Sequence, residues 1–133
     1  SQEGSLLAYN AAFEVSRLRE LAEGFAGSAE ALLALAGRAA DLMQPFKHQA
    51  YVLPEFHGRY SIKVLLPAMV PGMTYEGMVI ANGADAQLAF SAMAAGKMGR
   101  ADIEKTKEAL LVYCGQDTLA MVKILAKLYD AAG

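Results

Sequence analysis

The feature that most constrains the fold is the apolar periodicity of the last part of the chain, from about Ala101 onward. Apolar residues recur there with helical spacing and predict one long helix with a single buried face, made of Leu110, Leu111, Cys114, Leu119, Val122, Leu125 and Leu128. Gly115 lies inside this helix at a cost of about 1 kcal/mol relative to alanine. It either allows another backbone or a ligand to approach closely or is simply tolerated.

Length and composition predict a helix-rich globule that forms one domain or a piece of one. The chain has 133 residues, of which 55% are hydrophobic, and a chain of this length can bury roughly two thirds of its unfolded surface. No continuous apolar run reaches the roughly 18 residues that span a membrane, and the first residues do not form a signal peptide. We therefore expect no membrane partner. The net charge of −2 and the lack of a Lys/Arg block mean that any nucleic-acid binding would depend on a local site.

The single cysteine, Cys114, excludes an intrachain disulfide and fits a reducing, cytoplasmic location. It could be a nucleophile or a packing residue. Because it lies mid-helix among apolar residues, we expect it to be buried in the core.

The first half of the chain predicts short strands between helices. Residues 5–9 form a short apolar run typical of a buried strand, and Asn10 is a suitable N-cap for a helix from Ala11 to about Glu23. Ser28 caps a second helix that ends near Leu35. Residues 41–43 are either a short strand or the end of a helix. Residues 46–58 are expected to form an ordered loop.

The second half is predicted to be mainly helical. A helix runs from about residue 60 to Met69 and ends before Pro71-Gly72, and residues 75–80 are expected to be extended. Asn82-Gly83 is a turn signal, residues 85–95 form an alanine-rich helix, and the final helix follows.

Two stretches carry candidate chemistry. Tyr113 and Asp117 are four residues apart and therefore share one face of the final helix. A carboxylate in this position can bind a hard metal ion while the phenol orients a water molecule. Asn10 to Glu14 lies where the first strand becomes a helix, at the carboxyl end of the strand, where open sheets bind ligands. Glu14 and Asp117 could share a divalent-metal site.

Together these stretches resemble two motifs of the DnaQ-like 3′–5′ exonucleases of the ribonuclease H-like superfamily. Asn10-Ala-Ala-Phe13-Glu14 is similar to the motif Asn-x-x-(Phe/Tyr)-Asp, with Glu in place of Asp, and Tyr113 to Asp117 matches Tyr-x-x-x-Asp of the tyrosine subclass. Asp41-Leu42-Met43 is similar to a segment that often lies between them. The run from Pro54 to Gly83 resembles a bacterial exonuclease-like family of unknown function.

The resemblance implies an α/β, helix-rich part of a ribonuclease H-like fold with few short strands. It also implies hydrolysis of single-stranded DNA or RNA from the 3′ end with two Mg²⁺ or Mn²⁺ ions. Asp117 and Glu14 would be metal ligands, Tyr113 would orient the attacking water, and Asn10 and Phe13 would contact the substrate, with Phe13 beneath the site or near the terminal nucleotide. Asp117, Glu14 and Tyr113 are the implied catalytic residues.

Two departures from the family pattern qualify this expectation. Glu14 is one methylene longer than the usual Asp, and the Asp-x-Glu motif of the first strand does not occur before Asn10. We therefore expect residues 1–133 to be the C-terminal portion of an exonuclease-like domain whose β-meander lies upstream, inactive alone and able to self-associate through the open edge of strand 5–9. The alternative is a non-catalytic helical module that binds nucleic acid or a protein partner.

Other polar residues have simpler interpretations. Asp41 is more readily explained as a cap or turn former than as a catalytic group. His48 and His57 lack further ligands at zinc-like spacing, and Lys63 is a solvated helix lysine unless it contacts a phosphate.

Overall fold

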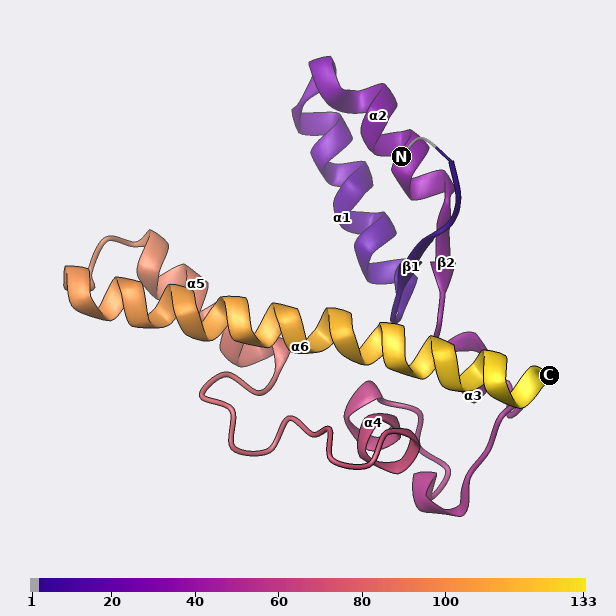
Figure 1. Ribbon diagram of the computed structural model, residues 1–133. Helices are drawn as coiled ribbons and strands as arrows, with labels where there is room; N and C mark the ends of the chain where they lie inside the picture. The colour runs from indigo at the N-terminus through magenta and orange to yellow at the C-terminus, as the bar shows by residue number, and fades with distance from the viewer. Residues whose placement is uncertain (1–2) are drawn as a thin grey trace.

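The computed structural model describes residues 3–133 as a mainly helical α/β chain with a small parallel sheet (Figure 1). Strand β1 (Leu6–Ala8) pairs with β2 (Ala39–Asp41) in parallel, with Leu6 opposite Ala39 and Ala8 opposite Asp41. The predicted helix-rich α/β class with few short strands is confirmed at this level.

A helical hairpin connects the two strands. It consists of α1 (Ala11–Gly24), the short 3-10 helix η1 (Ala26–Ser28) and α2 (Ala29–Gly37). The Phe25 N–H donates to the Leu21 carbonyl and closes the end of α1. We refer to residues 6–41, the two strands with this hairpin, as the arm. Figure 1 shows the hairpin extending away from the rest of the chain.

The carboxylate of Asp41 joins the end of β2 to the start of α1. Its Oδ1 accepts hydrogen bonds from the backbone N–H of Asn10 at 2.9 Å and of Met43 at 3.0 Å, and its Oδ2 accepts from Gln44 Nε2 at 2.9 Å. Burial would raise the pKa of Asp41, but hydrogen bonds from Gln44 and from nearby backbone N–H groups outweigh it and hold this pKa below its ordinary value. Asp41 thus forms the turn, as its simpler interpretation predicted.

Asn10 occupies the predicted N-cap position of α1, but it does not cap the helix through its side chain. Its backbone is left-handed, with φ 66°, a conformation that asparagine tolerates better than most residues, and its side chain makes no capping hydrogen bond. The ordered contact is instead its own N–H on Asp41. The expected side-chain capping by Ser28 of α2 is likewise not formed.

The remaining elements form the body of the molecule, residues 44–132. They are α3 (Gln44–Lys47), the 3-10 helix η2 (Pro54–Phe56), α4 (Ile62–Met69), α5 (Gly83–Ala94) and α6 (Arg100–Ala132). Their core is one cluster of buried side chains: Leu42, Phe46, Phe56, Leu65, Leu66, Met69, Tyr75, Ala120 and Ile124. Leu7 and Tyr9 at the end of β1 pack against this cluster, so the strands end beside the body.

Three segments of the body differ from expectation. The loop predicted at 46–58 contains η2 and the last two residues of α3. Residues 75–80, expected to be extended, form turns and bends without strand pairing. Asn82-Gly83 starts a helix, because the Asn82 side chain accepts a hydrogen bond from the Asp85 N–H at 2.9 Å and caps α5.

The predicted buried face of α6 is only partly confirmed, because Leu125 and Leu128 pack against the core cluster but other residues of that face do not. Ala120 and Ile124 are fully buried, whereas Leu111, Leu119 and Val122 of the predicted face are 74%, 45% and 57% exposed. Cys114 is exposed as well, so the expectation that it packs in the core is wrong. The reason is that α6 is apolar on both sides, and α4 and the loop after it cover the side that carries Ala120 and Ile124.

α6 is also long and apolar enough to cross a membrane by length and composition, the one such helix found within residues 3–133. The sequence contains no uninterrupted apolar run of this length, so the apolar character of α6 appears only as a mean hydropathy along the helix. The same criterion is met by core helices of other proteins.

Removing the Asp41 carboxylate should destabilise the junction between β2 and α1. We expect Asp41→Ala to lower the free energy of unfolding by about 1–2 kcal/mol, measured by urea denaturation, because three donors lose their acceptor. A native-state pKa below the unfolded value stabilises the fold above that value. The difference in the free energy of unfolding between the unmodified protein and Asp41→Ala should therefore shrink as the pH falls below 3.8. The exposed Asp130→Ala is the control, with a change within about 0.5 kcal/mol. A difference that persists unchanged at low pH would contradict this role.

Candidate functional site

Tyr113 and Asp117 lie one turn apart on the core-facing side of α6, as the spacing predicts. Both side chains are half-buried. A second phenol, Tyr75, donates to Asp117 Oδ1 at 2.6 Å, and the ring centres of Tyr75 and Tyr113 are 6.3 Å apart. The Asp117 carboxylate therefore accepts a charge-assisted hydrogen bond from Tyr75, and Tyr113 lies on the same side of α6.

Tyr75 was not identified from the sequence. It lies 42 residues before Asp117, in the segment between α4 and α5, and no motif relates the two. The same segment is fastened to α6 by Gln116, whose Nε2 donates to the Thr74 carbonyl at 3.1 Å. Two adjacent residues of α6 thus hold two adjacent residues of this segment.

The phenols of Tyr75 and Tyr113 both remain protonated at neutral pH. Burial, followed by the charge of the Asp117 carboxylate, raises the pKa of Tyr113 to about 12. Burial and the same carboxylate raise the pKa of Tyr75 well above its ordinary value. Each phenol can therefore donate a hydrogen bond but cannot act as a base.

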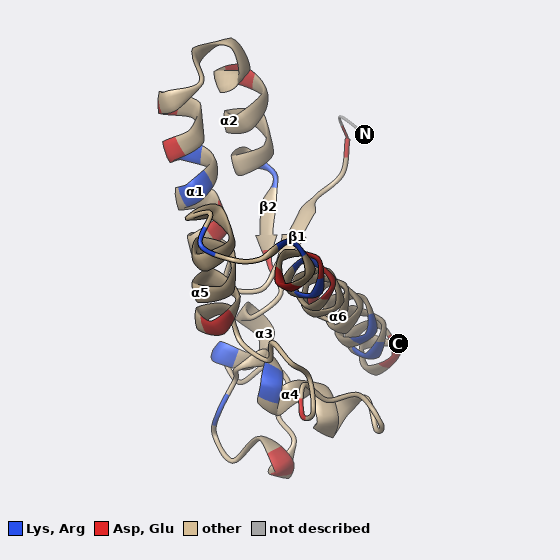
Figure 2. Cartoon of the chain, turned by 90° about the vertical axis from the view of Figure 1, so that its left-hand side faces the viewer, with Lys and Arg blue, Asp and Glu red and all other residues tan. Residues whose placement is uncertain are grey.

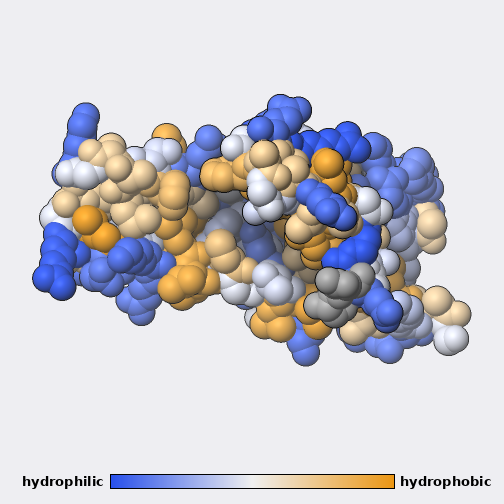
Figure 3. Space-filling model, turned by 90° about the horizontal axis from the view of Figure 1, so that it is seen from above, coloured by the Kyte–Doolittle hydropathy of each residue, from blue (hydrophilic) through white to orange (hydrophobic). Residues whose placement is uncertain are grey.

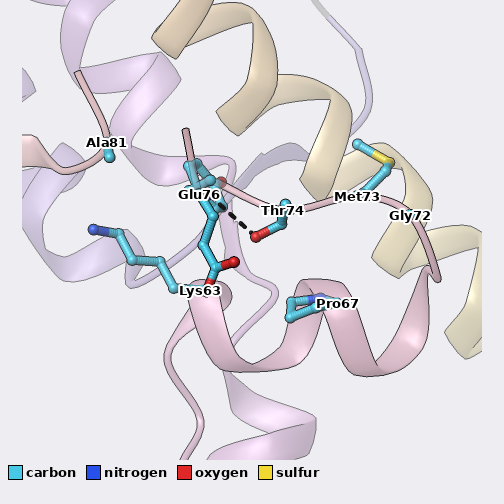
Figure 4. A pocket seen from close by; sticks show the side chains of 8 residues that line it. Lys63, Pro67, Gly72, Met73, Thr74, Glu76 and Ala81 are labelled. Atoms are coloured by element: carbon cyan, nitrogen blue, oxygen red, sulfur yellow. Dashed lines mark hydrogen bonds between the residues drawn. The ribbon is translucent and has the colours of Figure 1, made fainter. Parts of the chain in front are cut away.

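A cavity of about 600 Å³ lies beside Tyr75 (Figure 4), within the size range of ligand pockets. Lys63 on α4 and Glu76 on the following segment line it, and the Glu76 N–H donates to Thr74 Oγ1 at 3.1 Å. The Lys63 ammonium lies 5.9 Å from the centre of the Tyr75 ring. Lys63 is an exposed residue of α4, as its interpretation as a solvated helix lysine predicted, and it also lies beside Tyr75.

The site residues predicted on α1 do not lie beside Tyr75, Tyr113 and Asp117. Glu14, in the first turn of α1, is exposed, and so is Asn10. Phe13, expected beneath the site, is 62% exposed and instead lies under the Arg17 guanidinium, with 5.5 Å between the guanidinium carbon and the ring centre. Phe13 therefore does not pack beneath the site within residues 3–133, and its alternative position near a terminal nucleotide stays a prediction.

The carboxylates present do not by themselves fit a metal centre. Among residues 3–133, no group of three His, Cys, Asp or Glu side chains is placed so that it could hold an ion. The observed hydrogen-bond partner of the Asp117 carboxylate is the Tyr75 hydroxyl, not a further carboxylate. The implied ligands Glu14 and Asp117 would need additional acidic groups from outside this set.

Comparison with known proteins gives one partial match. Residues 1–61 are similar to a family described as a domain of unknown function (DUF2779). The match includes Asn10 to Glu14 and Asp41 but not Tyr113 or Asp117, and it covers less than half of the chain. No curated protein matches the chain, and no solved structure matches it.

Removing the negative charge of Asp117 should lower the pKa of Tyr113 from about 12 toward the ordinary value of 10.0. The carboxylate opposes formation of the phenolate, but burial is the larger cause, so we expect Asp117→Asn to reverse the shift only in part. The titration can be followed by the NMR shift of the tyrosine Cζ carbons, with Tyr113→Phe to assign the signal. Asp130→Asn is the control. An unchanged Tyr113 titration in Asp117→Asn would show that the two groups are not in contact in solution.

Proposed function

We propose that this chain is part of a 3′–5′ exonuclease domain that hydrolyses nucleic-acid phosphodiesters with Mg²⁺ or Mn²⁺. The observation that carries the proposal is the Tyr113–Asp117 pair, a phenol and a carboxylate that are both half-buried one helical turn apart on the same side of α6. The Tyr-x-x-x-Asp motif places the same two groups at this spacing. Tyr75 donates a hydrogen bond to the same carboxylate.

The position of the strands supports this proposal. β1 and β2 are parallel, so both carboxyl ends lie at the same edge of the sheet. Figures 1 and 2 both show this edge beside α6, and Leu7 and Tyr9 pack against the cluster that contains Ala120 and Ile124. Ligands of open α/β sheets bind at this edge. The Asn10–Glu14 stretch therefore starts on the side of the sheet that faces the helix carrying Tyr113 and Asp117.

The finer parts of the proposal are a ribonuclease H-like arrangement, single-stranded DNA or RNA as substrate, and a cytoplasmic location. Glu14 and Asp117 remain the proposed metal ligands. Because a two-metal centre needs more carboxylates than these two, we propose that the chain alone is inactive and that a further segment supplies the others.

A non-catalytic binding module remains a second candidate because of the large exposed apolar surface. Among residues 3–133, fifteen large hydrophobic residues are exposed. Figure 3 shows hydrophobic residues reaching the surface in several places on both sides of a recess. Contiguous exposed apolar patches mark interaction sites more often than catalytic ones. A binding module would not need a metal ion to bind its partner, whereas the proposed nuclease needs Mg²⁺ or Mn²⁺ to cleave its substrate.

The test is a nuclease assay on labelled single-stranded DNA and RNA with Mn²⁺, using both the 133-residue chain and the natural polypeptide that contains it. We expect cleavage from the 3′ end by the natural polypeptide alone, with Asp117→Asn lowering kcat at least about 100-fold and Tyr113→Phe lowering it less.

Matched controls are Asp130→Asn and Tyr129→Phe, both at exposed positions on the same helix. Equal activity of Asp117→Asn and Asp130→Asn would remove Asp117 from the site. Metal-dependent cleavage by the 133-residue chain would contradict its proposed inactivity. A natural polypeptide that binds but never cleaves any of these substrates would favour the binding module.

A further inference from the structure

α6 carries two apolar faces, and only one of them is covered. Ala120 and Ile124 lie on the core face. About half a turn around the helix, Leu111, Leu119 and Val122 form an exposed stripe, which Val112 and Tyr129 extend. Viewed along α6, Figure 2 shows α5 on one side, α4 below and the strands above. Residues 78–80 lie beside Glu108 and Val112, at one edge of the stripe. A helix that is apolar all round is normally buried on all sides.

The exposed area of the whole chain supports the same conclusion. The accessible surface is 8964 Å², whereas a compact monomer of 14.1 kDa would expose about 6,700 Å². The difference is about 2,200 Å², well above the roughly 800 Å² that each partner contributes to a standard protein interface. This excess belongs to the whole chain, including the arm that extends from the body, and the stripe of α6 contributes one part of it.

We propose that the uncovered stripe of α6 is an antiparallel dimer interface with a second copy of this chain, centred on Gly115. Gly115 lies in the middle of the stripe, and a Cβ added there would meet nothing within 4 Å. Two helices can approach most closely where glycine removes the side chain. This also accounts for a glycine in a helix interior, where it otherwise destabilises.

Charge complementarity selects the antiparallel second copy. With the two-fold axis between Gly115 and Gln116, residues equally far before and after the axis face each other. Val112 then lies opposite the partner's Leu119, and Glu108 lies opposite the partner's Lys123. Leu111 lies next to the partner's Val122. Glu108 and Lys123 both border the stripe, and neither forms an ion pair within its own chain among residues 3–133. A parallel pair would instead place like charges side by side.

The open edge of β1, predicted from the sequence as a self-association surface, is a weaker candidate. β1 has only three residues, so it offers few unpaired backbone groups, and short edge strands are a common protection against pairing. α6, with 33 residues, is about 50 Å long at 1.5 Å per residue. The stripe spans more than half of that length.

The first test combines light scattering with cysteine crosslinking. We expect the 133-residue chain to have twice its 14.1 kDa mass. In a Cys114→Ser background, Gly115→Cys should form an intermolecular disulfide under mild oxidation, because the two Cα atoms would lie within the reach of a disulfide. Tyr129→Cys is the control. It is 70% exposed on the same stripe, but its copies would be roughly 40 Å apart by the helix rise.

The second test is a charge exchange measured by sedimentation. Each dimer contains the Glu108–Lys123 contact twice, so Glu108→Lys should weaken the dimer Kd by about tenfold at low salt. The double variant Glu108→Lys/Lys123→Glu restores opposite charges and should recover the original Kd. Circular dichroism of each variant separates loss of association from loss of folding.

The outcomes of these tests distinguish a second copy of the chain from a lipid surface and from an interface elsewhere on the molecule. A monomer at all concentrations would overturn the proposal, and a monomer that co-sediments with phosphatidylcholine vesicles would assign the stripe to a lipid surface. A dimer in which Gly115→Cys crosslinks no faster than Tyr129→Cys would place the interface elsewhere, with the β1 edge as the first alternative. A double charge variant no tighter than Glu108→Lys would overturn the antiparallel register.

Discussion

The packing of α6 on α4 determines the rest of the structure. Ala120 and Ile124 of α6 and Leu65 and Leu66 of α4 are fully buried in one cluster. The small side chain of Ala120 leaves room for the large residues of α4 at this contact. Because residues at i and i+4 share a helix face, the same contact directs Tyr113 and Asp117 toward the segment after α4. That segment then supplies Tyr75, so the candidate site is a consequence of the core.

Local patterns predicted where the elements lie but not which sides they cover. The strand at 5–9, the start of α1 and the long final helix follow from apolar periodicity and were found near the expected residues. The buried face of α6 was found only in part, because apolar residues occur all around it and periodicity cannot decide between two apolar faces. The wrong expectations for Leu111 and Cys114 have this one cause.

The candidate site was predictable to the extent that it is local. The spacing of Tyr113 and Asp117 places them together on any helix, and in the structure both lie beside Tyr75. Tyr75 reaches the same carboxylate through the tertiary fold alone, so no spacing rule could reveal it. The role of Asp41 also depends on the tertiary fold. It accepts from Asn10 because β1 and β2 pair in parallel, and only its ability to form a turn was visible beforehand.

The small contact between the arm and the body has a consequence for dynamics. Within the arm, α1 packs extensively on α2, while the arm meets the body mainly through Leu7, Tyr9 and the chain that follows Asp41. The Tyr9 hydroxyl donates to the Tyr60 carbonyl across this boundary. Regions joined by few buried contacts open as separate cooperative units. The arm and the body therefore constitute two foldons, and amide hydrogens of α1 and α2 exchange through openings that leave the protection of α4 and α6 intact.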